Sequence, residues 1–295
     1  MIDAEATPCS EASAQLGEPL AGSASEAPLF AAIAWPKARW HPDKAARSEG
    51  LPSAVAELEP RAKRAGRKLQ LRLFERPGTR AESVEVICAD FRHGRTLVHA
   101  LADAERAAEA IAAFVAGDTS GPPLAAPLIL VCTDGRHDRC CGKLGRSLVS
   151  ALRGAADVDV AEASHLGGHR LAANCLALPS GRLYGRVTPA DVPALLDAVR
   201  GDSVHLPCYR GQSGLGELEQ VAEAAALACH PSARSLRFAA ARTDAGEARV
   251  SVTGPDVRLE VTCARRVYSA IASCGDAEPE RRERWVAVQV RPGPP

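Results

Sequence analysis

Alternation between apolar and polar residues divides the first part of the chain into short segments. Apolar or alternating runs, which predict buried or half-buried strands, lie at residues 29–35, 68–76, 84–90 and 96–101. Between the first two runs, Val55, Leu58 and Ala62 recur at helical spacing, so we expect a helix over residues 51–65. Asp103 precedes another periodic segment and can cap the N-terminus of a second helix. The predicted order is strand, helix, strand, hairpin, helix.

The second part of the chain repeats this order. Strands are predicted at residues 127–132, 158–164, 175–178 and 182–187. Helices are predicted at residues 141–153 and 189–200, and Gly181 lies in the turn between the last two strands. Because the two halves show the same succession, they indicate an internal duplication. The expected fold class is α/β, with two thioredoxin-like βαβ-ββα units in tandem and a small C-terminal β-rich appendage.

The same patterns set the expected domain boundaries. Residues 1–27 lack periodicity and are expected to be loosely ordered. The first unit covers residues 28–122. The second unit covers residues 123–232, and a last helix over residues 213–229 is expected to pack on it. Residues 233–295 contain short alternating runs broken by glycine and proline, which predicts the β-rich appendage.

Composition narrows the class of protein. The chain has 295 residues, of which 36 are basic and 36 acidic, so charge gives no argument for binding nucleic acid or an anionic membrane. No apolar run reaches the length of a membrane span, and the N-terminus lacks the basic and apolar regions of a signal peptide. We therefore expect a cytoplasmic protein. In that compartment the ten cysteines favour metal binding or free thiols over disulfides.

Cysteine and histidine gather in one stretch of the second unit. Cys132 ends a predicted strand and Cys141 begins a predicted helix, while His165 and His169 follow the next strand. Thiolates and imidazoles suit zinc or an iron–sulfur centre and do not suit calcium or magnesium. The eight residues between the cysteines fit structural zinc poorly, because its cysteines usually stand two to four residues apart. A thiol-redox site would use Cys140 and Cys141, but adjacent cysteines close a strained ring.

This stretch resembles the sucrase/ferredoxin-like family, thioredoxin-like ferredoxins whose [2Fe-2S] cluster is held by two cysteines and two histidines. The resemblance rests on Cys132, Arg136, Asp138, Cys141, His165, His169 and Arg170, and it continues through Asn174, Tyr184, Tyr209 and the N-terminal Cys9-Ser10 and Gly17 to Ser23. It implies that Cys132 and Cys141 bind one iron and that His165 and His169 bind the other. Cys140 is the alternative to Cys141 as the second thiolate.

The resemblance also implies supporting roles around the cluster. Arg136, Asp138, Cys140 and Arg170 are expected to fix the ligand loops by ion pairs or hydrogen bonds, as residues next to metal ligands do. The first unit has no cysteine and histidine set at the matching places, so we expect it to be a structural or docking unit.

The favoured function is electron transfer with an unidentified redox partner protein, rather than a stand-alone enzyme activity. Imidazole ligands in place of two thiolates raise the reduction potential from about −400 mV to roughly −150 to +300 mV in Rieske centres, and the ligating histidines should make it depend on pH. Two alternatives stay open. One is a binding or scaffold module, stabilised by zinc or free of metal, and the other is a thioredoxin-type thiol oxidoreductase.

Overall fold

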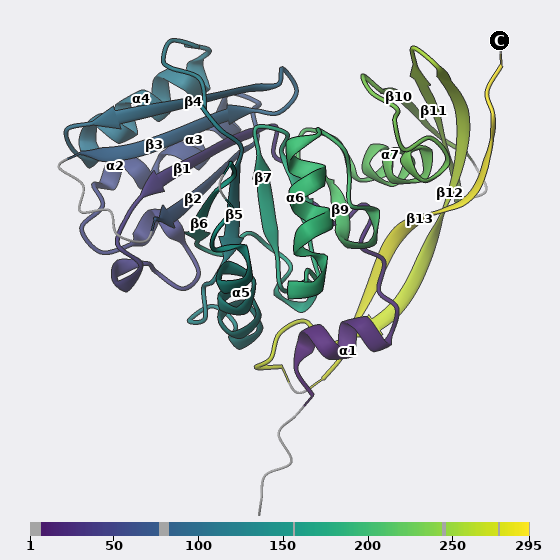
Figure 1. The fold of residues 1–295 in the computed structure, drawn as a ribbon, viewed down its shortest axis with the longest axis horizontal. Coiled ribbons are helices and arrows are strands. Elements are labelled where there is room, and N and C mark those ends of the chain that lie inside the picture. The colour runs from purple at the N-terminus through teal and green to yellow at the C-terminus, as the bar shows by residue number, and fades with distance from the viewer. Residues whose placement is uncertain (1–6, 77–82, 156, 244–245, 277, 295) are drawn as a thin grey trace, which may run out of the picture.

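Two β-sheets organise the chain (Figure 1). The structure is a computed structural model that describes residues 7–76, 83–155, 157–243, 246–276 and 278–294. In these residues a large, curled, mixed sheet has the strand order β4-β3-β1-β2-β6-β5-β7-β8-β9, and a separate antiparallel sheet has the order β10-β11-β12-β13. The predicted α/β class with a β-rich C-terminal part is therefore confirmed.

The first half of the large sheet follows the predicted order. Strand β1 runs parallel to β2 and antiparallel to β3, and β3 forms a hairpin with β4. The predicted helix over residues 51–65 is divided in two, because Pro60 lacks an N–H and is tolerated only in the first turn of a helix. The elements are β1 (Leu29–Ala34), α2 (Ser53–Ala56), α3 (Leu58–Arg64), β2 (Leu69–Glu75), β3 (Val84–Asp90), β4 (Arg95–Leu101) and α4 (Ala104–Ala116).

The second half has the same strand relations as the first. Strand β5 runs parallel to β6 and antiparallel to β7, β7 pairs with β8, and β9 is added at the edge. The elements are β5 (Leu128–Cys132), α5 (Arg139–Leu152), β6 (Asp159–Ala163), β7 (Cys175–Leu178), β8 (Arg182–Tyr184), α6 (Val192–Arg200) and β9 (Tyr209–Gln212). The repeated order supports the predicted internal duplication.

The two halves meet at β2 and β6, the outer strand of each. They pair antiparallel, with Phe74 opposite Ala163 and Glu75 opposite Glu162. A single apolar core crosses the junction, since Phe30 and Phe74 pack in one cluster with Leu128 and Ala163. Burial of such large side chains stabilises the folded state by about 2 kcal/mol each. The halves are therefore joined by a common sheet and core rather than by a linker alone.

The C-terminal sheet packs on helix α7 (Glu217–Cys229). Val221 and Ala226 of this helix share a core with Val250, Val261 and Trp285. We expected this helix to pack on the second unit, but its buried face also covers the C-terminal sheet. That sheet consists of β10 (Arg237–Arg242), β11 (Ala248–Gly254), β12 (Val257–Ala270) and β13 (Glu280–Pro292).

The β12–β13 hairpin is longer than the sequence predicted. Its far half carries Arg265, Arg266, Arg281 and Arg282, so the alternation that marks a half-buried strand is lost there. In Figure 1 this hairpin, drawn in yellow, runs past α7 towards α1 (Cys9–Gln15) and the lower end of α5. Its tip, residues 271–276, therefore lies near the second half of the large sheet.

The N-terminal segment is packed where the structure describes it. Cys9, Ser13 and Glu18 are buried, and residues 7–27 thus differ from the loose ordering expected for residues 1–27. The segment is held by polar contacts with charged groups of the second half and of the hairpin. Apolar periodicity in the sequence does not reveal contacts of this kind.

Gly145 fixes the approach of α5 to β5. A Cβ atom there would lie 2.0 Å from the carbonyl oxygen of Cys132, a backbone atom that cannot turn aside. We expect Gly145→Ala to lower the free energy of unfolding by at least about 2 kcal/mol, although alanine is the better helix former. Chemical denaturation measures it. Ser150→Ala, on the exposed face of the same helix, is the control, and equal stability of both variants would contradict the close approach.

Candidate metal centre

Cys132 and Cys141 come together because a strand ends where a helix begins. Cys132 is the last residue of β5, and Asp138 caps α5 by accepting a hydrogen bond from the backbone N–H of Cys140 at 2.7 Å. The first turn of α5 then places Cys141 Sγ 3.8 Å from His165 Nδ1. Ligand atoms of Cys132, Cys141 and His165 lie within 4.8 Å of one another. Cys140 faces a different group, so the geometry favours Cys141 over Cys140 as the partner of Cys132.

The loop that carries the two histidines is held by buried polar contacts. Gly168 has φ of 74°, a left-handed conformation that glycine adopts without strain. Arg210 donates to the carbonyl oxygen of Gly167 at 2.9 Å and to Asn174 Oδ1 at 2.8 Å, and Asn174 Nδ2 donates to the carbonyl oxygen of Gly168 at 2.9 Å. Arg210 therefore shapes this loop from inside the protein.

His169 belongs to a second group, in which ligand atoms of His137, His165 and His169 lie within 4.8 Å of one another. His165 is common to this group and to the cysteine group, whereas His169 is not part of the cysteine group. The ring centroids of His165 and His169 are 5.4 Å apart, and His137 stacks on His165 at 3.7 Å. His169 Nε2 forms a hydrogen bond with the carbonyl oxygen of Ala272 in the hairpin tip. Because a carbonyl only accepts, Nε2 carries the proton and Nδ1 has a free lone pair. That Nδ1 atom is buried and has no hydrogen-bond partner among the described residues.

The pKa values of the two thiols are shifted in opposite directions. A hydrogen bond from Cys141 lowers the pKa of Cys132 well below its usual range, and His165 lowers it further. The same hydrogen bond, together with burial, raises the pKa of Cys141. Burial lowers the pKa of His169, because it disfavours the charged ring. These shifts favour the thiolate at Cys132 and the neutral imidazole at His169, which are the forms that bind metal.

Of the expected supporting residues, Arg136 and Asp138 act on neighbouring segments. Arg136 donates to the backbone carbonyl oxygens of Ala38 at 2.8 Å and of Trp40 at 3.1 Å, which fixes the cysteine loop to the first half. Besides capping α5, Asp138 Oδ2 accepts from Ser273 Oγ and from the Cys274 N–H, both at 3.0 Å. It therefore joins the start of α5 to the hairpin tip.

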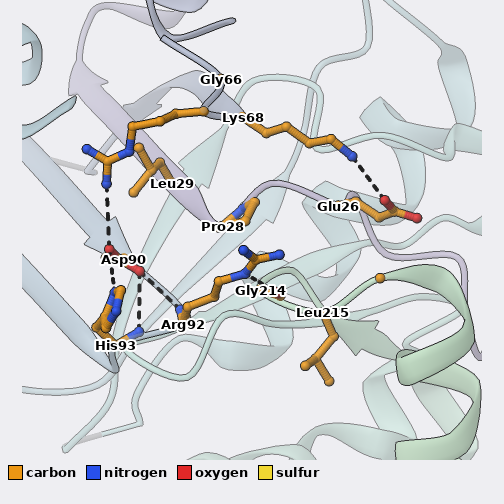
Figure 2. Close-up of a pocket in the computed structure, with 12 residues that line it drawn as sticks. Glu26, Pro28, Leu29, Gly66, Lys68, Asp90, Arg92, His93, Gly214 and Leu215 are labelled. Carbon is orange, nitrogen blue, oxygen red and sulfur yellow. Dashed lines mark hydrogen bonds and ion pairs between the residues drawn. The ribbon is translucent and has the colours of Figure 1, made fainter. Parts of the chain in front are cut away.

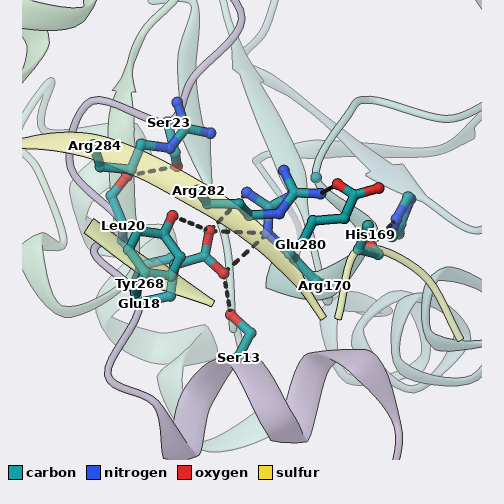
Figure 3. A network of polar contacts seen from close by, with 12 residues as sticks. Ser13, Glu18, Leu20, Ser23, His169, Arg170, Tyr268, Glu280, Arg282 and Arg284 are labelled. Atoms are coloured by element: carbon teal, nitrogen blue, oxygen red, sulfur yellow. Dashed lines mark hydrogen bonds and ion pairs between the residues drawn. The ribbon is translucent and has the colours of Figure 1, made fainter. Parts of the chain in front are cut away.

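Arg170 enters a buried ion pair with Glu18 (Figure 3). Its Nη2 lies 2.6 Å from Glu18 Oε1, and the two side chains are 7% and 0% exposed. Glu18 also accepts from Ser13 Oγ at 2.7 Å and from Tyr268 Oη at 2.9 Å. Burial alone would raise the pKa of Glu18, but the hydrogen bonds and charge of Arg170 outweigh it and lower that pKa. The network ties the N-terminal segment, the histidine loop and β12 together.

A second group of thiols was missed by the sequence reasoning. Cys140, Cys9 and Cys274 place their Sγ atoms 3.2 to 3.7 Å apart in each pairing, and Cys9 Sγ is 3.8 Å from Asp138 Oδ1. Hydrogen bonds from Cys9 and Ser10 lower the pKa of Cys140 to about 5. Cys9-Ser10 gave a weak signal, because the family resemblance extends to these two residues. No local sequence pattern connects Cys274, in the hairpin tip, to Cys9 or Cys140.

A model of the sucrase/ferredoxin-like family matches residues 20–211, which include Cys132, Cys141, His165 and His169. The chain belongs to the sucrase/ferredoxin-like family. The matched range ends before α7 and the C-terminal sheet, so the hairpin that touches His169 lies outside it.

Two relatives of this family member are both named Altered inheritance of mitochondria protein 32. The protein from Eremothecium gossypii is 33% identical over 106 residues, which cover 31% of this chain and 34% of that protein. The protein from Debaryomyces hansenii is 38% identical over 96 residues, which cover 29% of this chain and 35% of that protein. The chain therefore spans about a third of the length of these curated relatives. No solved structure matches the chain.

A hollow of about 280 Å³ lies among residues of β1, β3 and the start of α7 (Figure 2). Its charged side chains are paired with one another: Asp90 contacts His93 at 2.9 Å and Arg67 at 3.9 Å, and Lys68 contacts Glu26 at 3.1 Å. Arg92 also lines the hollow, and its Nε donates to the carbonyl oxygen of Gly214 at 3.1 Å. Because these charged groups are engaged by the protein itself, we assign the hollow no role.

Helices in the described part of the chain are all too short or too polar to cross a membrane.

Replacement of Glu18 tests the buried network. We expect Glu18→Gln to lower the free energy of unfolding by about 3 kcal/mol at pH 7, because it leaves Arg170 buried without its counter-ion. The pKa of Glu18 is lowered by folding, so its contribution is present above the unfolded value of 4.5 and is lost as pH falls through the folded value. The difference in the free energy of unfolding between wild type and Glu18→Gln should therefore become smaller as the pH falls below 4.5.

Denaturation between pH 3 and 8 measures this effect. Glu26→Gln is the matched control, because Glu26 pairs with Lys68 at the surface, where an ion pair contributes about 0 to 1 kcal/mol. A constant difference between wild type and Glu18→Gln over the whole pH range would contradict the role of the ionised carboxylate.

Proposed function

We propose that the protein is an electron carrier whose [2Fe-2S] cluster is held by Cys132 and Cys141 on one iron and by His165 and His169 on the other. The observation that carries the proposal is the buried Nδ1 of His169, which has no partner among the described residues while its Nε2 is fixed by Ala272. A buried polar atom without a partner costs about 1 to 3 kcal/mol, and a metal ligand bond removes that cost.

The donor set fits the cluster. Cys132 is shifted towards the thiolate, and both cysteines lie at the C-terminal end of β5 or in the first turn of α5. The positive end of the α5 dipole favours negative charge at that place. The imidazoles approach from the other side, on the loop after β6. Two thiolates and two neutral imidazoles are the ligands of Rieske-type centres.

When bound, such a cluster supplies one-electron chemistry at a potential above that of all-cysteine ferredoxins. The protein's own residues set the conditions for it. His169 Nε2 holds a proton against the Ala272 carbonyl oxygen. Leu166 and the two cysteines are buried, which excludes water from the cysteine side. His165 and His169 are half-buried, so an electron would enter or leave on the histidine side, where a redox partner protein could dock.

The proposal extends to the fold and its partners. Both halves repeat the order β-α-β-β-β-α with one parallel pair, which supports two thioredoxin-like units over residues 28–122 and 123–232 with a C-terminal part over residues 233–295. The first half would then serve as the docking or supporting unit. The cytoplasmic location stays a prediction, and the two relatives are named for altered inheritance of mitochondria.

The alternatives predict different metal contents. A zinc-stabilised binding module needs the same four ligands but gives a colourless protein. A thiol oxidoreductase needs two thiols that can exchange. The pair expected for it, Cys140 and Cys141, is buried, and the two thiols face different groups.

Histidine variants test the ligand set. Anaerobically purified wild type should be red-brown, hold two irons and two sulfides per chain, and give a Rieske-like EPR signal when reduced. His165→Ala and His169→Ala should each lose or shift this signal, while His93→Ala, an exposed histidine of the first half, should leave it unchanged. A wild-type protein that stays colourless after reconstitution with iron and sulfide would exclude the electron carrier.

The pH dependence of the potential tests the proton on His169. Reduction adds negative charge beside the ring, so the proton on Nε2 is held more tightly and the potential should fall with rising pH. The expected limit is about 59 mV per pH unit where one proton accompanies one electron. Voltammetry of wild type and of His169→Cys measures it, since a thiolate carries no such proton. A potential that is flat from pH 6 to 10 in wild type would contradict this role.

A further inference from the structure

Three cysteine thiols and one carboxylate converge behind the proposed cluster, outside its ligand set. Cys9 comes from α1, Cys140 and Asp138 from the start of α5, and Cys274 from the tip of the β12–β13 hairpin. The Sγ–Sγ distances are 3.7 Å for Cys9–Cys140, 3.2 Å for Cys140–Cys274 and 3.5 Å for Cys9–Cys274. All four residues offer ligand atoms within 4.8 Å of one another.

We propose that Cys9, Cys140, Cys274 and Asp138 form a structural Zn²⁺ site that fastens the hairpin tip and helix α1 to the start of α5. Zinc prefers four ligands in a tetrahedron, with Zn–S bonds of about 2.3 Å, which places sulfur atoms about 3.8 Å apart. The observed Sγ–Sγ distances are shorter than this by about 0.1 Å for Cys9–Cys140, 0.3 Å for Cys9–Cys274 and 0.6 Å for Cys140–Cys274. Binding of the ion would therefore move Cys140 Sγ and Cys274 Sγ apart.

The carboxylate has room for one metal bond. Asp138 Oδ1 accepts from the Cys140 N–H, and Oδ2 accepts from Ser273 Oγ and the Cys274 N–H. An ionised carboxylate has about four lone-pair positions, and both oxygens of Asp138 are 3.8 Å from Cys9 Sγ. Oδ1 accepts one backbone hydrogen bond and Oδ2 accepts two, so Oδ1 has the position left for a metal. The same hydrogen bonds orient the carboxylate, as the outer contacts of a metal ligand usually do.

The surroundings fit a soft metal ion better than free thiols. Cys9 and Cys140 are buried beside Ala172, with Leu144 and Ile271 packed against them. Three thiolates and a carboxylate carry four negative charges, of which Zn²⁺ offsets two, and the N-terminus of α5 stabilises the remainder. The thiol protons leave to solvent when the ion binds. The ligand types exclude calcium and magnesium, which require oxygen.

The site is separate from the proposed cluster even though its ligands are adjacent in sequence. Neighbouring residues of a helix point about 100° apart, so Cys140 and Cys141 face different groups. Zinc bound by the group with Cys140 and iron bound by the group with Cys141 can therefore be told apart by element analysis. The zinc proposal can fail while the cluster proposal holds, and the reverse is also possible.

X-ray absorption on the full-length wild-type protein is the deciding experiment. The protein is purified without chelator from cells supplied with zinc and iron. At the zinc edge we expect one zinc per chain with three sulfurs at about 2.3 Å and one oxygen at about 2.0 Å. Two sulfurs and two nitrogens at the zinc edge would show that zinc occupies Cys132, Cys141, His165 and His169, which would overturn the inference.

Variants assign the ligands by metal content. Cys9→Ser and Cys274→Ser should each lose most of the zinc and keep the iron, whereas His165→Ala should do the reverse. Cys263→Ser is the control, because Cys263 is buried in the core of the C-terminal sheet. A wild-type chain without zinc, or one whose peptide masses show a Cys140–Cys274 disulfide, would also overturn the inference. The wild-type spectrum decides the question even if a variant fails to fold.

Discussion

The buried ion pair between Glu18 and Arg170 is the constraint on which the site depends. A carboxylate and a guanidinium with so little exposure are stable only when each satisfies the other and further donors fill the remaining positions. Glu18 meets this condition with the nearby Ser13 and with two distant partners, Arg170 and Tyr268. Since Arg170 directly follows His169, the ion pair also sets where that ligand lies. The N-terminal segment and the C-terminal hairpin are thus parts of the site rather than appendages.

Arg210 also fixes the position of the histidine loop, by contacts different from those of Arg170. It is buried, and burial lowers its pKa to about 9, which is an energetic cost of desolvation. Four hydrogen bonds to Ser23, Gly167 and Asn174 compensate for that cost. The buried side chains of Arg170 and Arg210 therefore hold the loop of residues 165–169 in place. Such a loop keeps its imidazoles in place without a metal, which lowers the entropy lost when one binds.

The sequence was informative wherever a feature depends on local pattern. The apolar run of β5 and the periodicity of α5 predicted that Cys132 ends a strand and that Cys141 lies near the start of a helix, as the structure has them. Contacts between distant segments could not be predicted in this way. Cys274 is separated from Cys9 by 265 positions, and the far half of the hairpin has polar residues on both faces. The near half of the hairpin packs on α7, and its far half and tip are held by Glu18, Asp138 and His169, all of which are distant in the sequence.

Adjacent cysteines on α5 link the two candidate metal groups. Cys141 faces Cys132 and His165, while Cys140 faces Cys9 and Cys274. The hairpin tip also contacts both groups. Cys274 belongs to one group, and the carbonyl oxygen of Ala272, two residues away, accepts a hydrogen bond from His169 Nε2 in the other. An ion that restrains Cys274 also restrains the carbonyl that selects the tautomer of His169. If zinc binds as proposed, the group of Cys9, Cys140 and Cys274 would therefore stabilise the geometry of the proposed cluster ligands and take no part in electron transfer.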